Sequence, residues 1–217
     1  MSSIQTRISS ASAVYGVVLN DTASLQAIGD LDAAPYKGAP KASVLYIKPA
    51  GTRVASGASV RLPQGATEVE VGATIGMVLG RSAARLTPEN ALEAVSGLVL
   101  AADLSLPHPS YYRPAIREKC FDGALPVSDI QPPVDLSGLE LNIEMDGKAV
   151  GGWSLASLVR TPAQLLAEVT EYMTLRAGDV LLVGVRYAAP RAARGSRVRI
   201  AAHGLGNLEF AIEGEAR

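Results

Sequence analysis

Glu68 and Glu70, separated by one residue, are a pair of carboxylates whose spacing could support metal chemistry. Alternate residues of a β-strand point to the same side, so both side chains would face one way. Carboxylate oxygens in this arrangement suit Mg²⁺ or Mn²⁺. A solvated strand face explains the same spacing without a metal. On spacing alone we favour the solvated face and keep the metal site as the second interpretation.

A second candidate centre combines Asp103, which ends the apolar run LVLAAD, with Lys119 further along the chain. Charged groups at strand ends in β-rich enzymes often line clefts. A partly desolvated lysine there can stabilise an enolate or a carboxylate. A surface ion pair is the alternative, and the two residues alone do not decide between these interpretations.

A group of arginines occurs late in the chain. Arginine clamps a dianionic substrate through bidentate hydrogen bonds, so the group could attract such a molecule. A solvated hairpin is the simpler interpretation, and we favour it. The residues concerned are Arg186, Arg191, Arg194, Arg197 and Arg199.

Other common catalytic patterns are missing from the sequence. His108 and His203 each lack a second ligand at metal-binding spacing. There is no Gly-x-Ser-x-Gly elbow, and Cys120 has no recognisable histidine partner nearby. A single cysteine also excludes an internal disulfide. These patterns do not indicate a hydrolase of the serine or cysteine type.

The composition indicates a globular protein. Apolar residues make up 48% of the 217 residues and charged residues only 19%, which favours a packed core over disorder. A net charge of −1 provides no basic field for nucleic acid. No apolar run is long enough to span a bilayer, and the first ten residues do not resemble a signal peptide. We therefore expect a cytoplasmic protein with no nucleic-acid or membrane partner.

The elements that would position these residues are mostly strands. Thr87-Pro88 and Thr161-Pro162 each predict a helix start, the first continuing to Val95 and the second to Tyr172. Asp146-Gly147 predicts a hairpin turn. The pattern favours a β-rich α+β fold in one domain, 1–217, in which 1–40 is a strand plus a loop lead-in. Apolar runs predict strands at 14–19, 43–48, 69–79, 98–103, 139–145, 180–185 and 197–201.

Three motifs, in this order along the chain, carry a family resemblance. Tyr46-Ile47-Lys48-Pro49 resembles a Phe-x-Lys-Pro strand, and LVLAADLSLPHPSYYRPAIREKCFDGALP resembles a strand ending in Asp-x-Ser before a Lys-x-x-Asp segment. Leu175 to Val180 resembles a Leu-x-Pro-Gly-Asp-Val turn. Together they resemble the fumarylacetoacetate hydrolase family. That resemblance implies a mixed β-roll in which Mg²⁺ or Mn²⁺ holds a 2-oxo acid.

The segment 110–116, SYYRPAI, narrows the resemblance to one group of the family. It is similar to the amino-terminal-type half, or subunit, of the bifunctional decarboxylase/isomerases of homoprotocatechuate (4-hydroxyphenylacetate) breakdown. The resemblance implies decarboxylation of 5-carboxymethyl-2-oxo-hex-3-ene-1,7-dioate and isomerisation of 2-hydroxyhepta-2,4-diene-1,7-dioate. It implies Asp103 and Lys119 as catalytic residues. It implies Lys48, Tyr112 and Arg113 as contacts to this 2-oxo dicarboxylic or tricarboxylic acid.

The metal ligands of the family are the main departure. Its Glu-x-Glu lies eight and six residues before a Gly-Lys turn, and counting back from Gly80-Arg81 gives Gly72 and Thr74. Glu68 and Glu70 lie four residues too early, about 13 Å along an extended strand. Asp103 is then the one matched ligand, and a single carboxylate holds Mg²⁺ poorly. We therefore expect the family's Mg²⁺ or Mn²⁺ to be absent or weakly bound.

Further family positions also differ. The lid motif Asn-Tyr-x-x-His aligns with residues 20–24, so Ser24 replaces its histidine, and Pro107 replaces an arginine. Val185 replaces the threonine of Gly-Thr-Pro. These changes predict a weak or inactive pocket in a homo- or hetero-oligomer with a carboxy-terminal-type subunit that keeps Glu-x-Glu. A catalytically silent scaffolding half and an acylpyruvate-type hydrolase of the same family are the alternatives.

Overall fold

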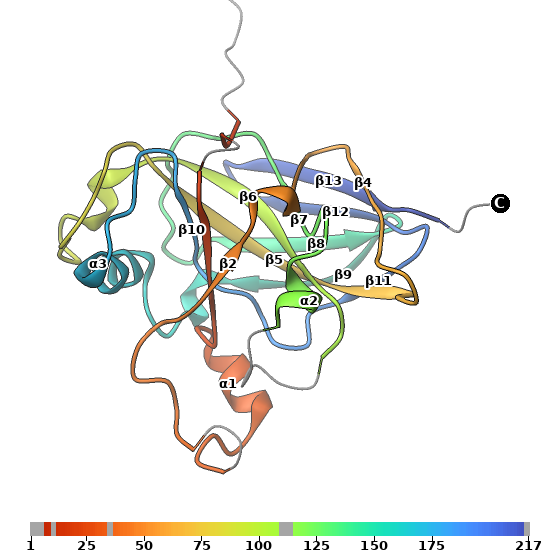
Figure 1. Ribbon diagram of the computed structural model, residues 1–217, viewed down its shortest axis with the longest axis horizontal. Helices are drawn as coiled ribbons and strands as arrows, with labels where there is room; N and C mark the ends of the chain where they lie inside the picture. Colours follow the sequence, from red (N-terminus) through yellow and green to blue (C-terminus); the bar gives the residue numbers. More distant parts are fainter. Residues whose placement is uncertain (1–6, 10–11, 34–36, 109–114, 215–217) are drawn as a thin grey trace, which may run out of the picture.

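The structure is a computed structural model that describes residues 7–9, 12–33, 37–108 and 115–214. In these residues, one sheet has eight strands and the other has five (Figure 1). The larger sheet has the spatial order β2 (Val44–Lys48), β1 (Val14–Val18), β10 (Val180–Leu182), β5 (Glu68–Leu79), β6 (Val95–Ser105), β7 (Leu125–Val127) and β3 (Arg53–Ala55), and β11 (Arg191–Ala193) also pairs with β5.

The smaller sheet and the short helices complete the described fold. The smaller sheet has the order β4 (Ser59–Val60), β13 (Gly206–Ile212), β12 (Arg197–Ala202), β8 (Glu140–Met145) and β9 (Lys148–Ser154). The α-helices are α1 (Thr22–Ile28), α2 (Ile116–Lys119) and α3 (Pro162–Tyr172), and the 3₁₀ helices are η1 (Ala50–Thr52), η2 (Ala91–Ala94) and η3 (Leu155–Ser157). The β-rich α+β fold expected from the sequence is confirmed.

The long strand β5 separates two apolar clusters, because its alternate residues face opposite sides. Ile75 and Met77 belong to the main core, which also contains Leu141 and Ile200 of the smaller sheet. The opposite face carries Val78 into a second cluster. This second cluster draws on β1, β5, β6, β7 and β10, so the larger sheet is curled around it. The buried members are Val14, Val78, Val99, Ala101, Leu125, Val127, Val180 and Leu182.

Two glycines allow neighbouring chains to approach β5 closely. A Cβ at Gly72 would lie 2.8 Å from the main-chain oxygen of Asp103, and one at Gly76 would lie 2.6 Å from a methyl of Val180. The register between β5 and β6 shifts instead at Val78 and Leu79. These glycines therefore mark a close approach of neighbouring chains, not a bulge.

One of the two predicted helices is confirmed. Thr161 caps α3, accepting from the main chain of Gln164 while the Gln164 side chain accepts from Thr161. The helix predicted from Thr87 is wrong beyond one short turn, since only η2 forms and β6 already begins at Val95. The residues from Val95 onward pair with β5 instead, and this pairing ends the turn.

The amino-terminal region contains a helix that the sequence did not predict. Residues 1–40 were expected to form a strand plus a loop, but α1 occupies Thr22–Ile28 within them. Asp21 caps this helix by accepting from the Ser24 main chain at 2.9 Å. The predicted Asp146-Gly147 hairpin is confirmed, and both of its residues have positive φ. In the described residues no helix is long and apolar enough to cross a membrane.

Candidate active site

Asp103 lies where β6 approaches its end, on the face that carries the second apolar cluster. It pairs with Gly72 across the β5–β6 ladder, so the two positions point to the same side of the sheet. Its side chain has no exposed area. A carboxylate buried this completely needs charged or hydrogen-bonding partners, and three side chains converge on it.

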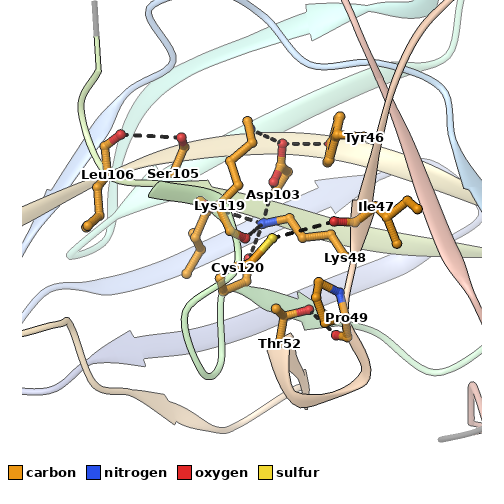
Figure 2. Close-up of polar contacts among 12 residues, drawn as sticks. Tyr46, Ile47, Lys48, Pro49, Thr52, Asp103, Ser105, Leu106, Lys119 and Cys120 are labelled. Atoms are coloured by element: carbon orange, nitrogen blue, oxygen red, sulfur yellow. Dashed lines mark hydrogen bonds and ion pairs between the residues drawn. The ribbon is translucent and has the colours of Figure 1, made fainter. Parts of the chain in front are cut away.

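Two of these partners share one oxygen of the carboxylate. Lys119, at the end of α2, donates from Nζ to Asp103 Oδ2 at 2.6 Å, and the Tyr46 hydroxyl donates to the same atom at 2.7 Å. The Lys119 ammonium also lies 4.8 Å from the centre of the Tyr46 ring. Figure 2 shows Tyr46 and Lys119 directed at Asp103 from β2 and α2. The predicted pairing of Asp103 with Lys119 is therefore present.

Lys48 is the third partner and lies under the carboxylate. Its Nζ is 2.6 Å from Asp103 Oδ1 and donates to the main-chain oxygens of Leu104, Lys119 and Ala124 at 3.1, 2.6 and 3.0 Å. Three carbonyl acceptors use all three N–H bonds of an ammonium. Oδ1 is held by the Lys48 ammonium through this ion pair, which is as short as the shortest of the three carbonyl contacts. By these bonds Lys48 ties β2 to β6, to the end of α2 and to the chain entering β7.

The charges around Asp103 fix its protonation state. Burial works to raise the pKa of Asp103, but the Lys119 and Lys48 ammonium charges outweigh it and hold the pKa at about 2. Burial lowers the pKa of Lys48, against the opposing charge of Asp103. At neutral pH Asp103 is thus a carboxylate and has no proton to give. Among these four side chains, only the two lysines and Tyr46 carry transferable protons.

Comparison with known proteins shows the family of the chain. The family model described as fumarylacetoacetate (FAA) hydrolase C-terminal matches residues 13–213 of the chain. The chain belongs to the fumarylacetoacetate hydrolase family. The 4-hydroxyphenylacetate degradation bifunctional isomerase/decarboxylase of Salmonella dublin is 38% identical over 203 residues, which cover 93% of this chain and 47% of that relative. The chain therefore spans about half the length of the bifunctional relatives it matches.

Solved structures of this family share the fold. The 5-carboxymethyl-2-hydroxymuconate delta-isomerase from Mycobacterium smegmatis has a TM-score of 0.80 at 24% identity, covering 94% of this chain and 78% of that one. The fumarylpyruvate hydrolase from Pseudomonas aeruginosa, solved in complex with Mn²⁺ and pyruvate, has a TM-score of 0.76 at 21% identity. That match covers 94% of this chain and 90% of that chain.

The positions aligned with the family's metal ligands lie beside Asp103. Gly72 is opposite it, and Thr74 is opposite Ala101, one pair further along the same face. Neither residue brings a carboxylate, and Val185 packs within 3.0 Å of where a Gly72 Cβ would be. No group of three or more His, Cys, Asp or Glu side chains able to hold a metal occurs in the described residues. Asp103 offers one carboxylate, fewer than the several oxygen ligands that Mg²⁺ requires.

Glu68 and Glu70 are engaged elsewhere on β5. Arg191 of the adjacent strand β11 pairs with Glu68 at 2.7 Å and with Glu70 at 3.2 Å. Glu70 stands opposite Ser105, two residue pairs before the Gly72–Asp103 pair. The structure therefore keeps these carboxylates outside the family's ligand positions, in ion pairs at the side of the sheet.

The other late arginines do not gather around Asp103. Arg186 donates to the main-chain oxygen of Gly152 at 3.0 Å and lines a separate cavity of about 230 Å³. Arg199 pairs with Glu144 and Glu209 on the smaller sheet. These contacts agree with the solvated interpretation of the arginine group. Of the predicted substrate contacts, Tyr112 and Arg113 lie outside the described residues, whereas Lys48 lies beneath Asp103.

Ser24, which aligns with the family's lid histidine, has a structural role in this chain. Ser24 is buried in α1, donates from Oγ to Asp21 at 2.6 Å and accepts from the Tyr187 main chain at 2.8 Å. Asp21 is also held by Ser157. The bond from Tyr187 to Ser24 and the bond from Ser157 to Asp21 fix α1 to the rest of the fold, so Ser24 has a structural role.

Tyr46 is the site residue that the sequence did not identify. The strand motif containing Lys48 was recognised, and residues two apart in a strand face the same side. That parity places Tyr46 beside Lys48, but it does not show how far the hydroxyl reaches. The position of the Tyr46 ring depends on a residue far away in the sequence. Gly16, opposite Tyr46 on β1, leaves room for the ring.

Proposed function

We propose that this chain is a subunit of a 4-hydroxyphenylacetate (homoprotocatechuate) catabolic decarboxylase/isomerase, and that its own metal site is degenerate. The observation that carries the proposal is the pair Asp103–Lys119, retained and buried while the facing positions Gly72 and Thr74 lack carboxylates. Their donor set does not fit a divalent cation. We derive no reaction step through one in this chain.

The substrates follow from the relatives rather than from the site. In this proposal the complex decarboxylates 5-carboxymethyl-2-oxo-hex-3-ene-1,7-dioate and isomerises 2-hydroxyhepta-2,4-diene-1,7-dioate. The bifunctional relatives are about twice as long as the stretch they share with this chain, which leaves room for a second half. A separate carboxy-terminal-type subunit with an intact Glu-x-Glu would provide the metal-dependent chemistry. A single domain at a cytoplasmic location completes the proposal.

Each residue of the site has a proposed role. Lys119 would stabilise the carboxylate or enolate oxygens of a 2-oxo acid, because it is the one lysine of the pair with exposed side-chain area, 7% against 0% for Lys48. Asp103 would hold Lys119 in place, and Lys48 would hold Asp103. Tyr112 and Arg113 remain the proposed contacts to the remaining carboxylates of the substrate.

The proposal is tested by comparing the purified chain alone with its complex with a metal-competent carboxy-terminal-type subunit. We expect the isolated chain to turn over neither substrate and the complex to turn over both. Substituting Lys119→Met in this chain should then lower turnover by the complex while leaving the assembly intact by size-exclusion chromatography. Turnover of the dienoate by the isolated chain, with one metal ion per chain, would contradict the proposal.

A scaffolding half is the second candidate, and one observation favours it. Asp103 has no exposed area, and its Oδ2 atom is already bonded to two donors. A chain that only supports its partner would show the same features. The Lys119→Met complex separates the two candidates, since a scaffolding half predicts unchanged turnover.

A further inference from the structure

We propose that Tyr46 is the residue that commits Asp103 to Lys119 and so keeps divalent cations away from the carboxylate. The inference deepens the metal-free site of the proposed function by naming a positioning residue within it. It rests on three contacts: the Tyr46 hydroxyl on Oδ2, the Lys119 ammonium on the same oxygen, and that ammonium against the Tyr46 ring.

Tyr46 holds Lys119 in place in two ways, through its hydroxyl and through its ring. Its hydroxyl hydrogen-bonds the oxygen that Lys119 needs, and its ring attracts the ammonium from 4.8 Å. A phenylalanine would keep the ring and lose the hydroxyl, so the two contributions can be separated by substitution. Hydrogen bonds to a charged group are the stronger kind, which makes the hydroxyl the contact to remove first.

A glycine on the neighbouring strand makes room for the Tyr46 ring. Gly16 pairs with Tyr46 across β1 and β2, and a Cβ at position 16 would lie only 2.1 Å from the ring carbon that bears the hydroxyl. No side chain fits there while the ring stays in place. Tyr46 also packs against the buried cluster of Val18, Leu19 and Val185. Val185 is the residue that covers Gly72. Tyr46 thus contacts Asp103 directly, while Val185 covers Gly72, the residue opposite Asp103.

A cation approaching Asp103 would meet competition at both oxygens. Oδ2 carries the Tyr46 and Lys119 donors, and Oδ1 faces the buried Lys48 ammonium at 2.6 Å. Binding to Oδ2 would require both donors to leave and would bring the metal beside two positive charges. The missing carboxylates at positions 72 and 74 are therefore only part of the obstacle.

The first measurement follows Lys119 in the natural chain by reductive methylation with labelled formaldehyde and peptide mass spectrometry. Tyr46→Phe should increase the labelling rate of Lys119 by roughly tenfold, the factor expected when one hydrogen bond to a charged group is lost. Lys148, exposed in the β8–β9 hairpin, is the internal reference and should not change. Tyr15→Phe, the same substitution on the opposite face of β1, is the matched control.

The second measurement asks whether the hydroxyl opposes a cation. Thr74→Glu supplies one carboxylate on the face of Asp103, and Mn²⁺ binding is followed by electron paramagnetic resonance with and without Tyr46→Phe. Adding Tyr46→Phe should tighten Mn²⁺ binding by at least roughly tenfold, for the same reason. Gly16→Ala should act in the same direction because it displaces the ring. Far-ultraviolet circular dichroism checks that each variant is folded.

The outcomes separate this inference from the proposed function. Stoichiometric Mn²⁺ in the wild-type chain would overturn the metal-free site itself. A wild-type chain without Mn²⁺, combined with unchanged Lys119 labelling in Tyr46→Phe, would overturn only the role of Tyr46. If Thr74→Glu does not fold, the labelling experiment still decides the inference.

Discussion

The substitution Asp103→Asn tests the buried charges most sharply. It keeps the shape of the side chain and removes its charge, leaving the Lys48 and Lys119 ammonium groups close together without an anion. Whichever way the amide is turned, its NH₂ group faces a donor: Lys48 at the Oδ1 position, or Lys119 and Tyr46 at the Oδ2 position. Removing one partner from a buried ion pair costs roughly 3–5 kcal/mol.

For a chain of this size that loss corresponds to a fall in melting temperature of roughly 6–20 °C. Thermal and urea unfolding of wild-type and Asp103→Asn chains would measure it. The double variant Asp103→Asn/Lys119→Met, which also removes one ammonium, should recover part of the loss. Glu213→Gln, in the exposed Arg61–Glu213 pair, is the control and should not change stability measurably. A loss below about 1 kcal/mol for Asp103→Asn, the range of exposed pairs, would refute the reasoning.

Three further predictions concern acid stability, β5 and the carboxylates near its start. Because the pKa of Asp103 is about 2 in the folded chain and 3.8 as a reference, its stabilisation is present above pH 4 and is lost as pH falls towards 2. Acid titration of stability should show this loss, about 2 kcal/mol in size, and Asp103→Asn should remove it. Gly72→Ala should destabilise the chain by roughly 1–3 kcal/mol in urea unfolding, since its Cβ would lie 2.8 Å from a main-chain oxygen, whereas a neutral effect would show that the strands separate easily. Replacing both Glu68 and Glu70 by glutamine should leave metal content unchanged, and a fall in bound metal would show that these residues are ligands.

The sequence predicted those parts of the fold that depend on local patterns. Alternating and continuous apolar runs located the long strands, and Asp146-Gly147 located the hairpin, because a positive φ at both positions is a local requirement. The cap and proline at Thr161 and Pro162 located α3. By contrast, Thr87-Pro88 carries the same local signal and gives only η2, because pairing of β6 with β5 uses the residues that follow.

The candidate site was predicted only where a motif carried it. Asp103 and Lys119 were first considered as a charged pair near a strand end, and the family resemblance then implied them as catalytic residues. Their contact in the structure joins two segments that no local pattern brings together. Tyr46 escaped notice because its role depends on Gly16, thirty positions earlier, having no side chain. The packing of Val185 on Gly72 is likewise a contact between distant segments. Contacts between such distant segments cannot be predicted from local sequence patterns.

The trio of charges also explains why the site can persist without a cation. Two buried ammonium groups and one carboxylate would be costly without further bonds, yet Lys48 places three hydrogen bonds on main-chain carbonyls. Those bonds hold β2 against β6 and the chain before β7. Lys48 and Asp103 therefore have a structural role that does not require a cation.

The most direct test of the metal-free site is the metal content of the chain after purification in the presence of Mn²⁺ and removal of unbound ions. Inductively coupled plasma mass spectrometry should find only background Mn²⁺ in the chain alone. It should find one ion per pair in the complex with a carboxy-terminal-type subunit. One Mn²⁺ ion per isolated chain would contradict the account.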